Sequence, residues 1–176
     1  MSATAGPMPM LAFSHADAER ALQEWGANCG PGALAAVLSL PLAAVRHAIP
    51  DFERRRYTSP TMMRAALAAL RVQIVRDERD RETDPERFPT HGLVRVQWEG
   101  PWTVPGSNPR WAYGRTHWVA SHANGPGAMW IFDINAGWTP SDYWAAIVVP
   151  SLTIGYARAT GQWWATHRWT VGRGGL

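Results

Sequence analysis

The sequence contains no lysine, only one cysteine and no apolar run as long as a membrane helix. A lone cysteine cannot form an internal disulfide, so the fold does not depend on an oxidising compartment. A membrane-spanning helix requires about 18 or more successive apolar residues, and the N-terminal residues lack the basic and apolar regions of a signal peptide. We therefore expect a soluble, cytoplasmic protein without a signal peptide and without membrane contact.

The absence of lysine leaves arginine to supply all 17 basic charges, and the formal net charge is +3. The arginines are scattered, and the densest groups, ERRR at 53–56 and RDERDRETDPER at 76–87, contain acidic residues. Mixed charge of this kind is typical of a solvated surface rather than of a phosphate-binding patch. We therefore expect no nucleic-acid partner, and we expect no cofactor and no bound metal.

The length of 176 residues favours one hydrophobic core. We expect a single domain over 1–176, with an N-terminal extension at 1–14 and a tryptophan-rich C-terminal segment of unknown role at 150–176. The tryptophans of that segment, together with Trp98, Trp102, Trp111 and Trp118, fit a substrate cleft or a docking surface, although core packing is the more economical explanation for several of them.

The order of the predicted elements indicates an α+β fold. Helical spacing and capping residues, among them Ser14 and Ser59, favour helices at 15–25, 30–40, 41–49 and 59–70. Apolar alternation between turn residues favours strands at 71–75, 92–98, 115–121, 128–134 and 144–149. Helices followed by antiparallel strands predict a sheet packed on the helix that carries the cysteine.

The single cysteine, Cys29, lies in QEWGANCGPGALAAVLSL, at the predicted start of an apolar helix. A cysteine in such a helix is most often a small hydrophobic core residue. The start of a helix, however, lowers the pKa of a thiol because unpaired N–H groups and the helix dipole favour an anion. Gly30 would let a substrate backbone approach, and Pro31 is tolerated in the first turn. A nucleophilic role requires a base and an orienting group nearby.

The predicted hairpin RTHWVAS-HANGPG-AMWIFDI supplies both groups. If its turn is centred on Gly125, residues whose numbers sum to 250 lie opposite one another, and His117 and Asp133 form such a pair. A carboxylate there accepts the second N–H of the imidazole and fixes its tautomer. Asn135 lies on the same face and is the reserve candidate for the orienting group. Gln23, six residues before Cys29, fits an oxyanion hole together with a backbone N–H.

The segment QEWGANCGPGALAAVL resembles the nucleophile region of papain-like cysteine peptidases. It is most similar to the double-glycine leader (bacteriocin-processing) peptidase family, in which a Gln, five residues and then Asp/Asn-Cys-Gly-Pro-Ala open the central helix. The segments PLAAVRHAI, TSPTMMRAALAAL, GLVRVQW, THWVAS and IFDINAGW follow the order of elements in that family. The resemblance covers roughly 23–149 and indicates a stand-alone peptidase domain.

The resemblance implies a papain-like fold, with the nucleophile helix among N-terminal helices that pack on a C-terminal antiparallel sheet. It implies Cys29 as nucleophile, His117 as general base and acid, Asp133 as orienting group and Gln23 as oxyanion donor. The family commonly has Asp-Pro where this chain has DIN at 133–135. The choice between Asp133 and Asn135 therefore stays open.

These observations predict a cysteine peptidase or amide hydrolase that cleaves a peptide bond through a Cys-His-Asp thioester mechanism, in a bacterium or a phage. Its partner would be a peptide or protein substrate, cell-wall peptides included. Two alternatives stay open. The fold could serve as a structural or binding module in a larger assembly such as a phage particle, or the same triad could serve a peptidoglycan amidase, an endopeptidase or a transferase.

Overall fold

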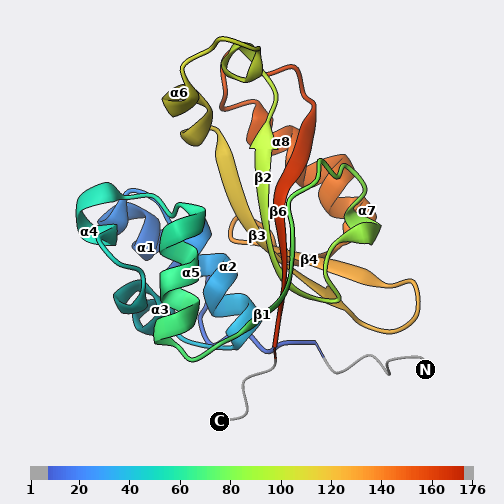
Figure 1. Ribbon diagram of the computed structural model, residues 1–176. Coiled ribbons are helices and arrows are strands. Elements are labelled where there is room, and N and C mark those ends of the chain that lie inside the picture. Colours follow the sequence, from blue (N-terminus) through green and yellow to red (C-terminus); the bar gives the residue numbers. More distant parts are fainter. Residues whose placement is uncertain (1–7, 173–176) are drawn as a thin grey trace.

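The computed structural model describes residues 8–172, and within them six strands form one antiparallel sheet (Figure 1). The strand order is β1-β6-β2-β3-β4-β5. The strands are β1 (Ile74–Glu78), β2 (His91–Trp98), β3 (Thr116–Ala123), β4 (Met129–Asp133), β5 (Gly137–Pro140) and β6 (Trp163–Val171). The predicted α+β class and antiparallel sheet are confirmed. Residues 1–7 of the predicted N-terminal extension and residues 173–176 of the C-terminal segment lie outside the described range.

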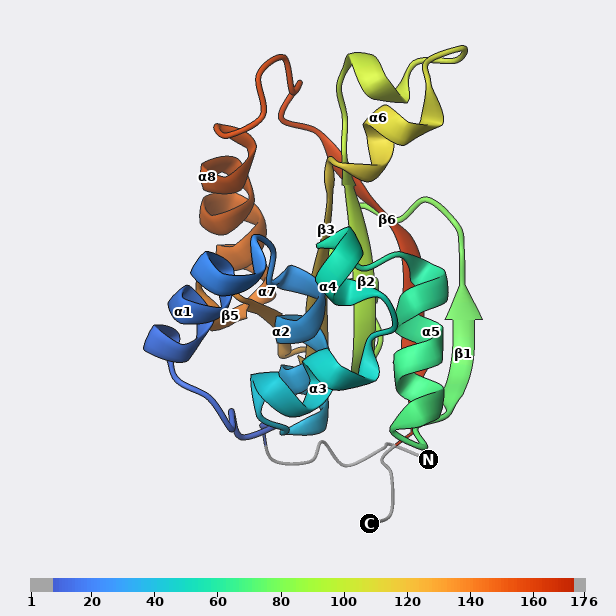
Figure 2. The same ribbon diagram turned by 90° about the vertical axis from the view of Figure 1, so that its left-hand side faces the viewer.

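Helices cover both faces of the sheet (Figures 1 and 2). The helices are α1 (His15–Trp25), α2 (Cys29–Leu38), α3 (Leu42–Ala48), α4 (Phe52–Arg55), α5 (Pro60–Ala69), α6 (Pro109–Tyr113), α7 (Ser141–Tyr143) and α8 (Val149–Thr153). A π-helical turn, η3 (Trp144–Val148), joins α7 to α8, and short 3₁₀ turns occur at Pro85–Arg87 and Pro101–Thr103. In Figure 2 the α1–α5 layer lies in front of the sheet.

Two serines begin helices as the sequence predicts. The Ser14 hydroxyl accepts a hydrogen bond from the Asp17 N–H, and the Asp17 carboxylate accepts one from the Ser14 N–H, so α1 opens with a capping box. Ser59 caps α5 by accepting from the Met62 N–H. Pro41, expected as the first residue of its helix, is instead the N-cap of α3.

Two hydrophobic clusters lie on opposite faces of the sheet. On one face, Leu34 of α2 is buried with Trp118 of β3 and Phe132 of β4. On the other face, Ile131 of β4 is buried with Trp144 of η3. The prediction that the sheet packs on the cysteine-bearing helix is therefore confirmed. Among residues 8–172 no single helix has the length and apolar character to cross a membrane. Helices α2 and α3 reach that length and apolar character only when they are taken together, and the chain bends by 112° between them.

The predicted strand at 144–149 is wrong, because this segment is helical. Its β-branched residues favour a strand, but burial follows a helical period: Trp144, Val148 and Val149 are buried, whereas Ala146 and Ile147 are exposed. Pro150 is tolerated because it lies in the first turn of α8.

The predicted strand at 71–75 begins too early. Arg71 takes a left-handed conformation with φ of 57°, and the N–H groups of Arg71 and Val72 bond back to carbonyls of α5. These residues therefore finish the end of α5, and β1 begins at Ile74.

The sequence prediction missed β6, the strand between β1 and β2, and also the short strand β5. β6 lies inside the tryptophan-rich segment whose role was unknown. Trp169 of β6 is fully buried beside Trp118, with ring centroids 5.3 Å apart, and Trp163 packs on Trp144. Trp169 is therefore a core residue, and Trp163 packs against the core. Both agree with the prediction that core packing explains several of the tryptophans.

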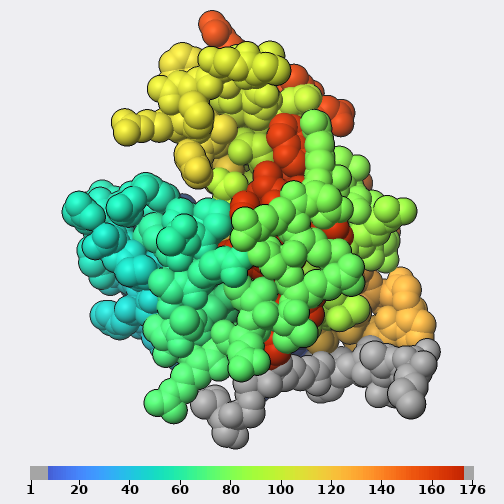
Figure 3. Space-filling view, in the orientation of Figure 1, coloured from blue at the N-terminus to red at the C-terminus, as the bar shows by residue number. Residues whose placement is uncertain are grey.

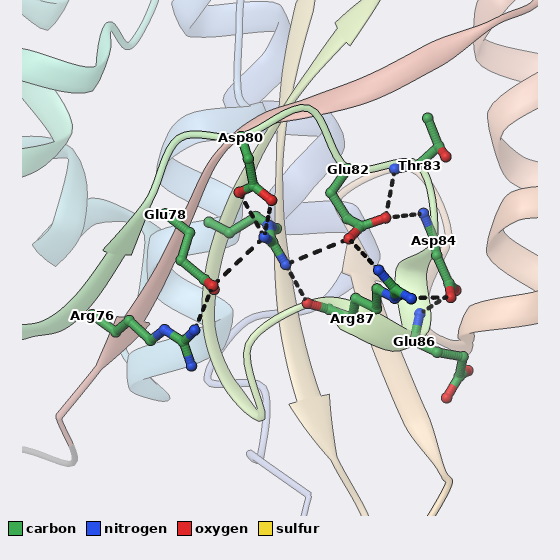
Figure 4. Close-up of polar contacts among 9 residues, drawn as sticks. Arg76, Glu78, Asp80, Glu82, Thr83, Asp84, Glu86 and Arg87 are labelled. Atoms are coloured by element: carbon green, nitrogen blue, oxygen red, sulfur yellow. Dashed lines mark hydrogen bonds and ion pairs between the residues drawn. The ribbon is translucent and has the colours of Figure 1, made fainter.

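The buried guanidinium of Arg168 ties the β1–β2 connection to β6, in addition to a backbone bridge between Glu82 and Ala165. Arg168 of β6 is buried, and its Nη2 donates to both oxygens of Asp80, at 2.7 and 2.9 Å. Glu78 and Glu82 lie within 3.6 and 3.9 Å of the same group. Figure 4 shows the three acidic side chains converging from the end of β1 and the connection that follows it. The charge of a strand residue is thereby balanced by acids from a segment about 90 residues earlier in the chain.

We expect Arg168→Met to lower the free energy of unfolding by about 2 kcal/mol or more, because it leaves three neighbouring carboxylates without their shared cation. Arg76→Met is the matched control. Arg76 bonds Glu78 from an exposed position, and such a pair contributes about 1 kcal/mol or less. Urea unfolding of both variants measures the difference. Equal midpoints would show that the acids are held by other contacts.

Candidate functional site

A cleft of about 560 Å³ lies where the helical layer meets one end of the sheet. One wall is formed by the start of α2 and the α4–α5 connection, and the other by β2, α6 and the start of β3. Figure 3 shows the surface hollowed between the yellow atoms around α6 and the cyan helices below them. Cys29, His117 and Asn135 line this cleft.

Cys29 is the first residue of α2 and is half-buried. The N-cap residue Asn28 makes no side-chain cap, because its amide donates to the Ala18 carbonyl of α1 at 2.9 Å. The first N–H groups of α2 therefore have no partner within the helix, and Pro31 has none to offer. Gly30 faces the Thr58 side chain, and an added Cβ would lie 2.2 Å from Thr58 Oγ1. The lack of a Cβ at Gly30 thus makes room for Thr58 rather than for a substrate backbone.

Asp133, at the end of β4, is fully buried and accepts four hydrogen bonds. Its Oδ2 accepts from His117 Nε2 at 3.0 Å and from the Trp144 indole N–H at 3.1 Å. Its Oδ1 accepts from the backbone N–H and the side-chain amide of Asn135, at 3.0 and 2.9 Å. Burial raises the pKa of Asp133, but the charge of His117 and these hydrogen bonds outweigh burial and lower the pKa to about 2. The carboxylate is therefore ionised near neutral pH.

His117 is held between the carboxylate and the cleft. An ionised carboxylate only accepts hydrogen bonds, so His117 Nε2 carries the proton that it shares with Asp133. Trp98 of β2 stacks on the imidazole, with ring centroids 6.3 Å apart and planes 28° apart. Burial lowers the pKa of His117, but the charge and hydrogen bond of Asp133, with a further contribution from Cys29, hold that pKa well above its usual value.

The pKa of the Cys29 thiol is lowered. Burial raises this pKa, but hydrogen bonding to His117, the positive charge of that ring and the backbone N–H of Trp118 outweigh burial. A low thiol pKa and a high imidazole pKa favour the same state, a thiolate beside an imidazolium. Cys29 therefore has the electrostatic surroundings of a reactive cysteine rather than of an inert core thiol.

The predicted register of the His117–Asp133 hairpin is wrong by two residues. In β3 and β4, opposing residues have numbers that sum to 252, as Ala120 and Phe132 do, and not to 250. The turn is one residue further along than expected. Because side chains alternate between the faces of a strand, a shift of two leaves every residue on its predicted face. His117 and Asp133 thus meet diagonally rather than directly opposite each other.

Within the described part of the chain, the two remaining predicted site residues make no hydrogen bond to the imidazole. Asn135 hydrogen-bonds Asp133, the residue that bonds His117, so it supports the carboxylate. Gln23 is exposed on α1 and does not line the cleft, although its neighbour Leu22 does. The structure therefore offers no support for Gln23 as oxyanion donor.

Two residues of the site, Trp144 and Arg95, were missed by sequence reasoning, whereas Trp98 was among the tryptophans expected to line a cleft or to pack in the core. Trp144 was assigned to a strand, and its indole contact with Asp133 depends on the helical turn η3. Trp98 and Arg95 line the cleft from β2. The strand at 92–98 that carries both residues was predicted from the sequence, but its pairing with β3 was not. Among residues 8–172 no cluster of three or more His, Cys, Asp or Glu side chains is arranged to hold a metal ion.

Comparison with models of known protein families finds no match for this chain, and comparison with curated protein sequences finds none either. The function is therefore inferred from the geometry and chemistry of the site itself.

We expect Asp133→Asn to raise the pKa of Cys29 and to lower that of His117. The charge of Asp133 raises the pKa of His117, and the substitution removes it. A less basic imidazole stabilises the thiolate less, and this loss exceeds the smaller direct repulsion between Asp133 and the thiolate. The pH midpoint of iodoacetamide alkylation reports the thiol, and NMR of the imidazole ring reports His117.

Asp142→Asn is the matched control, because it removes the same charge from an exposed residue outside the cleft. Both pKa values should stay unchanged in this variant. A thiol midpoint that does not rise in Asp133→Asn would show that Asp133 does not act on Cys29 through His117.

Proposed function

We propose that this protein is a cysteine peptidase or amide hydrolase that works through a thioester intermediate. The observation that carries the proposal is the chain of interactions from the fully buried Asp133 through His117 to Cys29, the only thiol of the sequence, in the wall of a cleft. A nucleophile, a base and an orienting group in this order are what acyl transfer by cysteine requires.

In the first half of the reaction, the Cys29 thiolate attacks an amide carbonyl carbon and forms the C–S bond. His117 Nε2 is occupied by Asp133, which leaves Nδ1 as the ring nitrogen for proton exchange with the thiol and the substrate. The imidazolium gives its Nδ1 proton to the leaving amine as the C–N bond breaks. Asp133 keeps the ring oriented and stabilises its positive charge.

In the second half, neutral His117 takes a proton from water, and the resulting hydroxide attacks the thioester. The C–S bond breaks, the acyl group leaves as a carboxylic acid, and the thiolate–imidazolium pair is restored. The first-turn N–H groups of α2, at Cys29 and Gly30, are the donors placed to stabilise the oxyanion of both tetrahedral intermediates. Gln23 is not needed for this step.

A papain-like fold is part of this proposal. It is supported by the thiol at the start of a buried helix, by the antiparallel sheet on which that helix packs, and by a histidine and an acid on adjacent strands. The resemblance of QEWGANCGPG to the nucleophile region of such peptidases points the same way. A papain-like fold is also consistent with a cleft that lies between the helices and the sheet of one domain.

We expect the purified protein to cleave an amide bond when it is incubated with a panel of peptides, cell-wall fragments and peptides mixed with amine acceptors. Cys29→Ala should abolish both cleavage and labelling by a thiol-directed probe, because the chain has no other thiol. His117→Ala should lower turnover by about 10²–10⁴-fold, the usual contribution of general acid–base catalysis. His47→Ala, an exposed histidine on α3, is the control and should leave turnover unchanged.

The panel separates the alternatives. Amine release with free acid identifies a hydrolase, and capture of the acyl group by the added amine identifies a transferase. A thiol that is labelled rapidly while no substrate of the panel is cleaved would favour a binding module in a larger assembly. Full hydrolysis by Cys29→Ala would refute the thioester mechanism outright.

A further inference from the structure

Arg95 is a buried cation without an acidic partner. It lies in the middle of β2, lines the cleft that contains Cys29, and is only 6 % exposed. Within the described residues it forms no ion pair with Asp or Glu, and its Nε has no hydrogen-bond partner. Arg168, buried to the same degree, is paired with three carboxylates. Burial lowers the pKa of Arg95, and the charge of the Cys29 thiolate offsets this only in part. A buried charge without a carboxylate partner is costly, so its retention in a cleft needs an explanation.

The fold holds the Arg95 side chain in a defined position. The β2–β6 ladder shifts register between Arg95 and Val96, and Thr166 is the extra residue of β6 at that point. Thr166 Oγ1 accepts from Arg95 Nη1 and donates to the Arg95 carbonyl, both at 3.2 Å. The guanidinium lies 5.5 Å from the Tyr113 ring, another residue of the cleft wall. A bulge that re-aims a side chain is common beside functional sites.

The cleft around Arg95 has a positive character. Its described lining contains Arg95, Arg56 and His117 but neither Asp nor Glu. Asp133 lies behind His117, with both of its oxygens bonded. Arg56 is exposed, so water screens its charge, whereas the charge of Arg95 acts in a drier environment.

We propose that Arg95 binds a carboxylate of the substrate, next to the acyl group that Cys29 attacks. A carboxylate is the planar partner that a guanidinium recognises through two parallel hydrogen bonds, and Arg95 has no such partner among the described residues although it lines the cleft. The substrate class is thus an acidic peptide, whose carboxylate comes either from its C-terminus or from an Asp or Glu side chain. This inference rests on the proposed function only in its use of Cys29 as the reacting atom.

A different role for Arg95 would be to stabilise the Cys29 thiolate itself. In that case, loss of Arg95 would slow every alkylating reagent by the same factor, because fewer thiolates would be present. A carboxylate-binding role affects only reagents that carry a carboxylate. The ratio of two alkylation rates therefore separates the two roles and cancels any change in the pKa of the thiol.

The experiment compares alkylation of Cys29 by iodoacetate, which carries a carboxylate, with alkylation by iodoacetamide, its neutral analogue. Each reagent forms an S–C bond at the thiolate and releases iodide, and the single cysteine makes the labelled site unambiguous. We expect Arg95→Gln to lower the iodoacetate-to-iodoacetamide rate ratio by about tenfold, the scale of a lost charge-assisted hydrogen bond. Arg110→Gln, which removes one exposed charge outside the cleft, should leave the ratio unchanged.

An unchanged ratio in Arg95→Gln, or an equal fall in Arg110→Gln, would overturn the proposal. A second measurement on the unaltered protein covers the case in which Arg95→Gln does not fold. N-acetyl-Ala-Ala as the free acid should protect Cys29 from iodoacetamide at about tenfold lower concentration than its carboxamide form. A carboxylate site would also be refuted if the acid and amide forms of N-acetyl-Ala-Ala protect equally and N-acetyl-Glu-Ala-amide protects no better than N-acetyl-Gln-Ala-amide.

The source of the carboxylate is identified by a second pair of peptides. N-acetyl-Glu-Ala-amide against N-acetyl-Gln-Ala-amide tests a side-chain carboxylate, as the acid and amide forms of N-acetyl-Ala-Ala test a terminal one. Neither the alkylation ratio nor the protection requires turnover. Failure of the proposed hydrolase activity would therefore leave a lowered ratio intact, and failure of the carboxylate site would leave hydrolysis of neutral peptides intact.

Discussion

The fully buried carboxylate of Asp133 is the constraint on which the site depends. A carboxylate without water stays charged only if hydrogen bonds replace its hydration, and here all of them come from three separate elements. β3 supplies His117, the turn after β4 supplies Asn135, and η3 supplies Trp144. These three elements must therefore be docked together before the carboxylate can be buried. The position of the imidazole follows from this docking, since Asp133 and the stacked Trp98 leave the ring little freedom.

The parts of the site that could be predicted from the sequence rest on local physics. The helix starts at Ser14 and Ser59 are hydrogen-bonded caps, readable from a few neighbouring residues. The shared face of His117 and Asp133 was also predictable, because it depends on the parity of the strand and not on its register. A register error of two residues therefore changed the geometry of the contact without changing the partners. A register error of one residue would have placed them on opposite faces.

The parts that could not be predicted are set by contacts between distant segments. β6 carries Thr166, His167 and Arg168 in succession, a polar run that resembles a loop until acids from the β1–β2 connection neutralise Arg168. The segment at 144–149 has consecutive β-branched residues, which favour a strand. Its tryptophan points inward because of two distant partners, the Trp163 ring and the carboxylate of Asp133. Gln23 illustrates the converse, since its spacing from Cys29 suggested proximity, while α1 continues past it and leaves its side chain exposed.

The charges of the site are distributed so that each anion except the substrate already has its partner. Asp133 is satisfied by its hydrogen bonds and by His117, and the thiolate is satisfied by the imidazolium, the Trp118 N–H and the start of α2. Arg95 is the buried cation in the cleft lining that pairs with no carboxylate of the described residues. His167, next to it on β6, does not share this charge, because burial first and then the charge of Arg95 lower its pKa to about 4, so the ring is neutral. A neutral substrate would leave the buried guanidinium of Arg95 without a carboxylate partner. An anionic substrate supplies that partner, but only when it is bound beside Cys29. Binding energy gained at that position is available to orient the carbonyl for attack.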